Sequence, residues 1–546
     1  MRVSISELEL KKLGIEVKKS LLSANLSLDG EKLNYPIIVG DGQCLVVRGI
    51  ERGNMAFLKP KVPKVVYYAP YFTWDGKAYD GVPVYPDISS AFRSLAKGQK
   101  IELANETPVE LYDILSRDFE VSVEKGAGEA KKVNVYKMKA SSVEEWLGEV
   151  NPAIKDAALK ILAGLNLETK ELEFIKGLLS KNFEAFASLK GFLGKVNSLF
   201  CSSPLSVGAL TGLRLKDIDE DTYAIYTPQN DEVYVLTPRR LDYGYMTLVD
   251  EGVDITKVLD RILVAPVGIE EKDLELKELE WVEKDTTGVT NVLREWRESI
   301  AYLDLPFYII GAHITKLPLE KALKFLQNNL GITERQVYEH YKDSLKDTLN
   351  SLNLPDISVA EYFVVLHAGD RTLIPSLPSD HVITPKSNTV KLDTGLKILY
   401  KGVLRAVSDL ARTLPLSEEA KRFYPILKET MLKVIIPSVS AGKKGGDIHQ
   451  AAIDGLKARV KGGEPVPEGI SLDEYNRDMG HVFGRQEPVT VAFIGGNTET
   501  IKAGMVGSVE LQWPYKQYAF GIEDSYLAGP DKGINFTSGN TSEESD

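Results

Sequence analysis

Cysteines and long apolar runs are both scarce in this sequence. Its 546 residues include two cysteines, Cys44 and Cys201, which are too few for a disulfide framework and lack the spacing of a cysteine metal site. No stretch approaches the ~20 consecutive apolar residues of a membrane helix. The first residues, MRVSISELELKK, carry charges where a signal peptide needs an apolar run. We therefore expect a cytoplasmic protein that does not enter a membrane.

Basic residues are also fewer than acidic residues. Lysine and arginine number 66 against 78 acidic residues, and the net charge is −12. Sequence-independent binding of DNA or RNA requires a basic face, so nucleic acid is not an expected partner. Hydrophobic residues make up 43% of the chain, as in ordinary globular proteins, and its length predicts about three or four domains.

The distribution of apolar residues divides the chain into five parts. Short β-rich runs bounded by turn residues indicate small α/β units, whereas long amphipathic patterns indicate helices. The expected parts are an α/β domain over 1–142, a helical connector over 143–199, a second α/β domain over 200–291, a larger α+β domain over 292–540 and an acidic tail over 541–546.

The two small units share a local pattern. RILVAPVGIEE (261–271) has the same order of features as KIELANETPVE (100–110): a strand, a turn with Pro or Gly, and an acidic helix start. This parallel suggests two related domains in tandem. The second also contains the clearest hairpin, in which TYAIYT (222–227) and EVYVLT (232–237) flank a turn rich in Pro, Asn and Asp.

Helix signals dominate the beginning of the larger domain. Pro318 is suited to the first turn of a helix whose apolar stripe includes Leu319, Leu323 and Leu326. A capping box from Thr333 to Gln336 predicts the start of the next helix.

The last third of the chain contains a set of residues with the chemistry of a metal site. Four carboxylates and one imidazole occur in order: Asp393 in VKLDTG, Asp409 in VSDLART, His481 in MGHVFG, Glu510 in GMVGSVELQWP and Glu523 in FGIEDSYLAG. Crowded carboxylates repel, and two divalent cations would cancel their four charges. An oxygen-rich set with one imidazole suits Mn²⁺, Co²⁺, Fe²⁺ or Zn²⁺.

Each of these residues also has a purely structural explanation. The aspartate of DTG is usually a turn residue, Asp409 could cap a turn, and Glu523 could end a solvated strand. His481 beside Gly480 could be a packed core histidine. The order of all five residues together favours the metal site.

The motifs resemble those of a known enzyme family. GITERQVYEHY, VVLHAGDRTLIPSLPSD, VKLDTG, VSDLART, MGHVFG, GMVGSVE and GIEDSYLAG are similar, in this order, to the C-terminal domain of the pita-bread metallopeptidases. That family includes methionine aminopeptidase, aminopeptidase P, prolidase and creatinase. The resemblance covers about residues 295–540. It implies an α+β protein in which a pita-bread domain follows two smaller α/β domains of the creatinase N-terminal type, as in three-domain aminopeptidases P.

The resemblance also implies roles for the five residues. Asp393 would bind one metal, Asp409 and Glu523 would bridge two metals, and His481 and Glu510 would complete the second. Glu510 would also be the catalytic proton shuttle. The implied reaction removes an N-terminal residue from a peptide, in particular before proline, and the family suggests a homodimer.

Three departures from the family pattern concern this site. The separation of Asp393 from Asp409 is longer than usual, and a hairpin that turns near Lys401–Gly402 would accommodate it with both side chains on one face. No histidine occurs between Thr372 and Asp380, where the family's peptidases usually have one, although His367 and His381 flank this segment. Arg485-Gln486 stands where a second substrate-contacting histidine is usual.

These departures leave two further interpretations open. A pita-bread domain can bind a peptide or protein without cleaving it, as in the large subunit of the FACT histone chaperone. The retained ligands favour the enzyme, and the missing histidines favour the binder. A creatinase-like hydrolase of small amidines is the third interpretation, and it too relies on histidines that are missing here.

Overall fold

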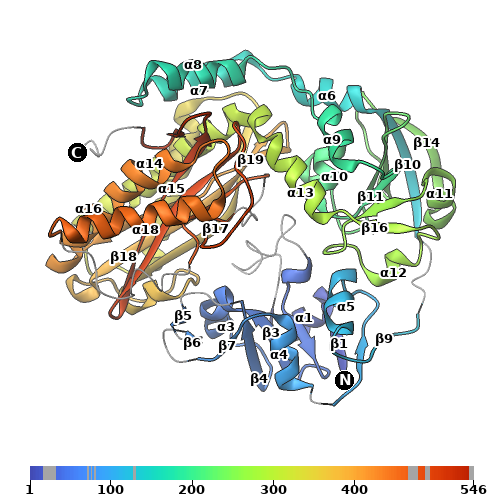
Figure 1. Ribbon diagram of the computed structural model, residues 1–546, viewed down its shortest axis with the longest axis horizontal. Coiled ribbons are helices and arrows are strands. Elements are labelled where there is room, and N and C mark those ends of the chain that lie inside the picture. The colour runs from blue at the N-terminus through green and yellow to red at the C-terminus, as the bar shows by residue number, and fades with distance from the viewer. Residues whose placement is uncertain are drawn as a thin grey trace. The chain divides into compact units, whose positions relative to one another are not determined.

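The computed structural model describes residues 1–15, 32–69, 73–74, 77–78, 82–96, 98–126, 131–464, 477–485 and 492–539. The chain forms two compact units, drawn in Figure 1. The N-terminal unit comprises Met1–Val150, Asn182–Arg297 and Lys401–Leu404, and the C-terminal unit comprises Asn151–Lys181, Glu298–Tyr400 and Arg405–Asp546. The predicted acidic tail lies outside the described residues.

The N-terminal unit contains a first sheet of seven strands, in the order β7-β4-β3-β2-β1-β8-β9. Its strands are β1 (Arg2–Ser4), β2 (Ile37–Val39), β3 (Cys44–Arg48), β4 (Lys64–Tyr68), β7 (Val84–Tyr85), β8 (Ile101–Leu103) and β9 (Val121–Val123). Its helices are α1 (Glu7–Lys12), α3 (Arg52–Leu58), α4 (Ile88–Leu95) and α5 (Val109–Ser116). A separate pair is formed by β5 (Thr73–Trp74) and β6 (Lys77–Ala78).

A second seven-stranded sheet in the same unit has the order β14-β10-β13-β12-β11-β15-β16. Its strands are β10 (Lys132–Lys139), β11 (Ser198–Cys201), β12 (Tyr223–Thr227), β13 (Glu232–Thr237), β14 (Thr247–Asp254), β15 (Val267–Ile269) and β16 (Thr286–Gly288). Its helices are α6 (Ala140–Gly148), α9 (Phe186–Leu193), α10 (Pro204–Thr211), α11 (Ile255–Ile262), α12 (Leu276–Leu279) and α13 (Thr290–Ser299). β10 lies before residue 142, where the sequence predicted the end of the first domain, yet it pairs with β13 in this second sheet. The predicted domain limits stay predictions.

The two sheets contain the same arrangement of five strands. In each, an antiparallel hairpin (β2–β3 or β12–β13) adjoins a strand that continues into two parallel partners, β1-β8-β9 or β11-β15-β16. The order of features expected in the two segments is present only in the first. β8 precedes the turn and α5 in 100–110, whereas in 261–271 Arg261 and Ile262 end α11 and the strand β15 follows Pro266. The suggested tandem relationship stays a prediction, and the predicted hairpin at residues 222–237 is confirmed.

The C-terminal unit is built around one antiparallel sheet of eight strands, with the path β17-β18-β20-β23-β22-β21 and with β19 and β24 paired to β18 and β23 (Figure 1). The strands are β17 (Ile357–Ala368), β18 (Thr389–Tyr400), β19 (Val403–Val407), β20 (Leu410–Pro415), β21 (Gly480–Val482), β22 (Val506–Tyr515), β23 (Tyr518–Ala528) and β24 (Gly533–Asn535). The helices are α7 (Pro152–Ala163), α8 (Thr169–Leu179), α14 (Leu305–Asn328), α15 (Glu334–Leu352), α16 (Glu418–Thr430), α17 (Ile436–Ser438) and α18 (Gly445–Lys461).

Alternation along these strands separates an apolar face from a polar one. Val390, Leu392 and Leu410 pack with the helices α14 and α15 in one core cluster. Val509 and Ile522 belong to another cluster, with α16 and α18. Because successive strand residues point to opposite faces, the residues between them in the sequence face away from these helices. Asp393, Glu510 and Glu523 are such residues.

Two helix predictions have different outcomes. The capping box is confirmed, since the backbone N–H of Gln336 donates to Oγ1 of Thr333 and the backbone N–H of Thr333 donates to Oε1 of Gln336. The placement of Pro318 at a helix start is wrong, because α14 begins at Leu305 and Pro318 lies inside it. An interior proline costs about 3 kcal/mol, and here the close packing of a mostly buried helix offsets it.

Among the described helices, none has both the length and the apolar character that a membrane-spanning segment needs.

Candidate metal centre

The five predicted ligands lie on neighbouring strands of the C-terminal sheet. Asp393 on β18 pairs with Ala411 on β20, Ala411 pairs with Glu523 on β23, and Glu523 pairs with Glu510 on β22. Residues directly opposite one another in antiparallel strands point to the same face. This cross-strand row, which we call the carboxylate row, therefore carries three of the five ligands toward one side of the sheet.

The other two ligands lie one step further along the same face. Asp409 is two residues from Ala411, in the break between β19 and β20, where the Ser508 hydroxyl donates to its carbonyl oxygen at 3.0 Å. His481 on β21 pairs with Ser508 of β22. The hairpin between Asp393 and Asp409 turns at Lys401 and Gly402, which both have positive φ, as the sequence predicted.

The side chains of this second step meet those of the carboxylate row. Nε2 of His481 lies 3.6 Å from Oδ2 of Asp409 and 3.6 Å from Oε1 of Glu523, and 4.0 Å from Oε2 of Glu510. Asp409, His481 and Glu523 each offer a donor atom within 4.8 Å of the others. Two donors that are each ~2.1 Å from one ion lie roughly 3–3.5 Å apart. The three residues thus have the chemistry and close to the spacing for one divalent ion.

Because these side chains are buried, their charges destabilise the folded protein in the absence of a cation. His481 and Asp409 are each 2% exposed, and Glu523 is 1% exposed. Buried carboxylates that lie together raise the free energy of the folded chain unless positive charge compensates them. A divalent ion held by these residues would supply that charge.

Two cationic side chains also reach the carboxylates. Lys391 on β18 is fully buried, and its Nζ donates to Oε1 of Gln512 at 2.8 Å. Nε2 of Gln512 in turn donates to Oδ2 of Asp393 at 3.2 Å. On the other side, Arg477 forms a hydrogen-bonded ion pair with Glu510.

The surroundings of Lys391 shift the pKa of its ammonium group. Burial, and secondarily the charge of Arg477, lowers the pKa of Lys391 to about 8, although Asp393, Glu510 and Glu523 oppose this shift. Sequence reasoning missed Lys391 and Gln512. The signal was available: each is two residues from a predicted ligand in a strand, in VKLDTG and VELQW, and must share its face.

Local backbone geometry sets the position of His481. Gly480 has a φ of +129°, and a Cβ atom there would overlap the carbonyl oxygen of Ser508 and approach Cα of Val509 to 2.8 Å. Only glycine allows β21 to lie this close to β22 in this conformation. The Gly-His pair is therefore required by the strand pairing that brings the imidazole to the carboxylates.

The purely structural explanations fail for two of the carboxylates. Asp393 lies within β18 and Glu523 within β23, so neither is a turn or strand-end residue. His481 is buried as a core histidine would be, but its nearest charged neighbours are carboxylates. The structure thus brings Asp409, His481 and Glu523 together with Glu510 beside them, and it places Asp393 on the same face of the sheet. The role of each residue as a metal ligand, and of Glu510 as a catalytic group, stays a prediction.

The histidines that flank the segment from Thr372 to Asp380 do not replace the missing one. His367 is fully buried in β17 and accepts a hydrogen bond from the backbone N–H of Ser376 at 2.6 Å. Burial holds the pKa of His367 well below its ordinary value, so the ring is neutral. His381 is exposed.

Arg485 has a structural role. It turns inward with a φ of +71°, and its Nε donates to Oδ2 of Asp304 at 3.0 Å. Asp304 also accepts a hydrogen bond of 2.6 Å from Nε of Arg405. The guanidinium group of Arg485 is thus bound to the buried carboxylate of Asp304. Gln486 lies outside the described residues.

The sequence of this domain matches a family profile. Residues 310–530 match the profile of "Metallopeptidase family M24", and they contain all five predicted ligands. This segment of the chain is similar to that metallopeptidase family. The M24 domain is the C-terminal pita-bread domain of the predicted architecture, and the fold class expected from the sequence is confirmed.

Several solved structures are similar to this chain at low sequence identity. X-prolyl aminopeptidase from Caenorhabditis elegans, described as a cytosolic enzyme with a di-nuclear active site, is 13% identical, with a TM-score of 0.56 over 92% of this chain and 81% of that one. Prolidase from Pyrococcus furiosus is 18% identical over 64% of this chain and 98% of that one, with a TM-score of 0.48. X-Pro aminopeptidase from Thermotoga maritima is 14% identical over 64% and 97%, with a TM-score of 0.49. No curated protein sequence matches the chain.

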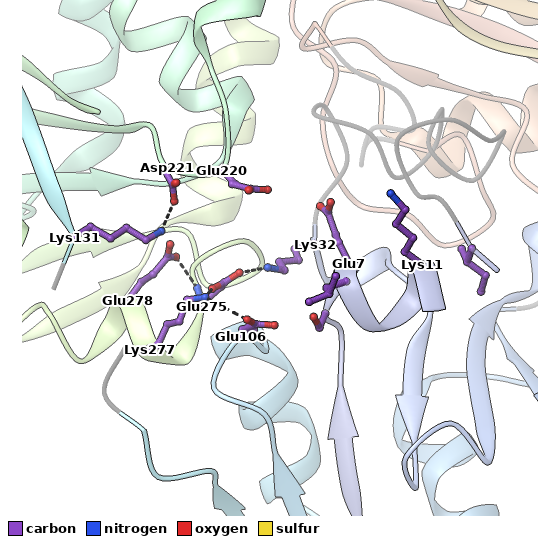
Figure 2. Close-up of a pocket in the computed structure, with 13 residues that line it drawn as sticks. Glu7, Lys11, Lys32, Glu106, Lys131, Glu220, Asp221, Glu275, Lys277 and Glu278 are labelled. Carbon is purple, nitrogen blue, oxygen red and sulfur yellow. Dashed lines mark hydrogen bonds and ion pairs between the residues drawn. The ribbon is translucent and has the colours of Figure 1, made fainter. Parts of the chain in front are cut away.

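A separate cavity of about 520 Å³ lies in the N-terminal unit and is lined by both acidic and basic side chains (Figure 2). Its charges pair with one another: Lys32 with Glu275, Lys131 with Asp221, and Lys277 with Glu275 at 2.6 Å. Burial and the neighbouring Glu275 raise the pKa of Glu278 to about 7. We interpret this group as an ion-pair network within the unit, apart from the chemistry of the M24 domain.

Proposed function

We propose that this protein is a metal-dependent peptidase that removes the N-terminal residue from peptides, with a preference for a bond that precedes proline. The match of residues 310–530 to metallopeptidase family M24 supports the metal-dependent hydrolysis, and the convergence of Asp409, His481 and Glu523 is the observation that carries it. The preference for proline is an inference from the solved relatives of similar fold, which include Xaa-Pro peptidases.

Asp409, His481 and Glu523 would hold a divalent ion, and the sequence predicted a second ion bound with Asp393. When bound, a divalent ion supplies Lewis acidity for a carbonyl group and for water. Mn²⁺, Co²⁺, Fe²⁺ and Zn²⁺ all fit the donor set.

Glu510 has the position expected of the proton-transferring group. Its Oε2 lies on the ligand side, 4.0 Å from Nε2 of His481, while Oε1 is held by Arg477. The ion pair fixes the carboxylate in one orientation, which favours proton transfer at Oε2. A peptide as the ligand, a cytoplasmic location and a homodimer complete the proposal.

Peptide turnover tests it. Full-length protein loaded with Mn²⁺ should release the N-terminal residue from Xaa-Pro peptides faster than from matched Xaa-Ala peptides. Asp409→Asn should lower kcat/KM more than about 100-fold, because it removes a ligand of the ion. Asp380→Asn, which changes an exposed aspartate, is the control for the loss of a surface charge.

Two outcomes would contradict the proposal. If the wild-type protein binds metal but cleaves Xaa-Pro peptides no faster than Asp409→Asn does, the domain is a binder and not a peptidase. If Xaa-Ala peptides are cleaved as fast as Xaa-Pro peptides, the hydrolase remains and the preference for proline is wrong.

A further inference from the structure

A row of residues adjacent to the carboxylate row carries positive charge into the same site. His367 pairs with Lys391, and Lys391 pairs with Thr413. The Thr413 hydroxyl donates to the carbonyl oxygen of Gly521 at 2.7 Å, and Gly521 pairs with Gln512. We call this set the lysine row. It is two residues removed from the carboxylate row on every strand, so the two rows face the same side.

Gly521 makes room for the lysine. A Cβ atom at position 521 would lie 2.5 Å from Cδ of Lys391 and 2.9 Å from Oε1 of Gln512. Without that atom, the side chain of Lys391 passes across β23 and reaches Gln512 on β22. The buried position of the ammonium group therefore depends on residues of three strands, β18, β22 and β23.

The hydrogen bonds of the lysine row already engage Asp393, one of the predicted metal ligands. Gln512 accepts from Lys391 through its carbonyl oxygen and donates to Asp393 through its amide nitrogen. Asp393 is the residue that, by the family resemblance, would bind the ion not held by His481. One of its two carboxylate oxygens is already a hydrogen-bond acceptor on the side of the lysine row.

The balance of charge points the same way. Within the buried set, Asp393, Asp409, Glu510 and Glu523 contribute four negative charges, and the side chains of Lys391 and Arg477 bring two positive charges among them. Arg477 is shared with the partly exposed Asp478, whose carboxylate lies 3.5 Å from the guanidinium group. One divalent ion would cancel the two negative charges that remain within the buried set, and a second ion would add positive charge close to the ammonium group of Lys391.

We propose that this site holds a single divalent ion at Asp409, His481 and Glu523, and that Lys391, acting through Gln512, takes the electrostatic place of the second ion beside Asp393, assisted by Arg477 on Glu510. This inference rests on the metal binding in the proposed function. It concerns the number of ions and not the choice of substrate.

Metal stoichiometry is the direct test. Metal-free full-length protein is titrated with Mn²⁺, passed through a desalting column and analysed for bound metal by mass spectrometry, with electron paramagnetic resonance of the bound ion. We expect one ion per chain and the spectrum of an isolated Mn²⁺. Two ions per chain with an exchange-coupled spectrum would overturn this inference and leave the peptidase proposal standing. No bound ion would overturn both.

Variants test the role of the two cations. Lys391→Met keeps nearly the length of the side chain but removes its charge, and Arg477→Gln removes the charge beside Glu510 with a shorter side chain. Each should make binding of a second Mn²⁺ at least about tenfold tighter than in the wild-type protein, because one opposing charge next to a carboxylate is removed. Lys397→Met is the matched control: Lys397 is a buried lysine on the same strand that lies over the ring of Tyr362, and its loss should not change stoichiometry.

Circular dichroism of each variant shows whether it is folded. If Lys391→Met does not fold, Arg477→Gln still tests the same charge argument, since Arg477 is only partly buried. If folded variants bind one ion with the wild-type affinity and show no second binding event, the lysine row does not replace an ion and the inference is wrong.

Discussion

Glu510 on β22 and Glu523 on β23 lie directly opposite each other in the antiparallel strand pair at the centre of the M24 domain. Like charges in this position destabilise a sheet, and these two side chains are 7% and 1% exposed. The pairing is tolerated because Arg477 and Lys391 lie nearby and because a divalent ion would bind beside them. Stability and metal binding are therefore coupled in this domain.

Removing metal should lower the melting temperature. At an ion concentration of ~100 times Kd, binding to the folded state adds about 2.7 kcal/mol to the free energy of unfolding. For a domain of this size we expect a shift of roughly 5–10 °C, measured by calorimetry on metal-loaded and chelator-treated protein. Asp409→Asn should show no such difference. Identical melting of the two wild-type samples would contradict the coupling.

Asp304→Asn should destabilise the M24 domain by about 3–5 kcal/mol. The change leaves the buried guanidinium groups of Arg405 and Arg485 without their shared carboxylate. Urea unfolding measures the effect. The control is Asp380→Asn, which breaks an exposed pair with Arg335 and should cost less than about 1 kcal/mol. Equal effects of the two variants would show that the buried pair has no special weight.

Gly480→Ala should cost more than about 3 kcal/mol and reduce metal content, because the added methyl group meets the backbone of β22 at a φ that alanine avoids. Gly177→Ala in α8 is the matched control, since nothing lies within 4 Å of its added Cβ. Replacing a glycine inside a helix should stabilise by about 0.4–1 kcal/mol. Denaturant unfolding of both variants measures the change in the free energy of unfolding. If both variants were destabilised, or both stabilised, the prediction would be wrong.

Glu278→Gln should change how stability depends on pH. The folded-state pKa of Glu278 is about 7, above its ordinary value of 4.5, so the folded chain binds more protons than the unfolded chain between these values. The wild-type protein should lose stability on the order of 1–3 kcal/mol from this group as the pH rises from about 4.5 to about 7. The variant should lack that loss, which unfolding at pH 4.5 and at pH 8 measures.

Replacing the carboxylate also alters its hydrogen bonds, which gives an offset at every pH. Glu278 accepts from the hydroxyl of Tyr223 at 2.6 Å and from the backbone N–H of Glu275 at 3.0 Å. The informative quantity is therefore the difference between the two pH values. Glu280→Gln, at an exposed position after the same helix, should keep the wild-type dependence. A parallel pH dependence of wild type and Glu278→Gln would contradict the raised pKa.

Local signals in the sequence were sufficient for the hairpin that carries two of the predicted ligands. Alternation in VKLDTG and a turn at Lys401–Gly402 predicted the hairpin that holds Asp393 and Asp409 on one face. The pattern of Thr333 and Gln336 predicted the start of α15 because both partners of a capping box are close in sequence. These features depend on contacts between near neighbours.

Features that depend on distant contacts were not predicted. Nothing near Pro318 shows that a helix has already begun at Leu305, because tertiary packing offsets the local cost. Lys391 meets Gln512, 121 positions later, only once β18 and β22 are in the same sheet. The metal ligands were found because their chemistry is distinctive, whereas a lysine in a strand is unremarkable until its neighbours are known.

Strands β22 and β23 are buried along their whole length, which has a consequence for the chain before it folds. Apolar, β-prone windows of about 5–7 residues aggregate when they are exposed, and a charge within them prevents this. Glu510 interrupts the apolar run of β22, and Glu523 with Asp524 interrupts that of β23. We therefore expect the carboxylates that destabilise the folded sheet to protect the newly made polypeptide from self-association.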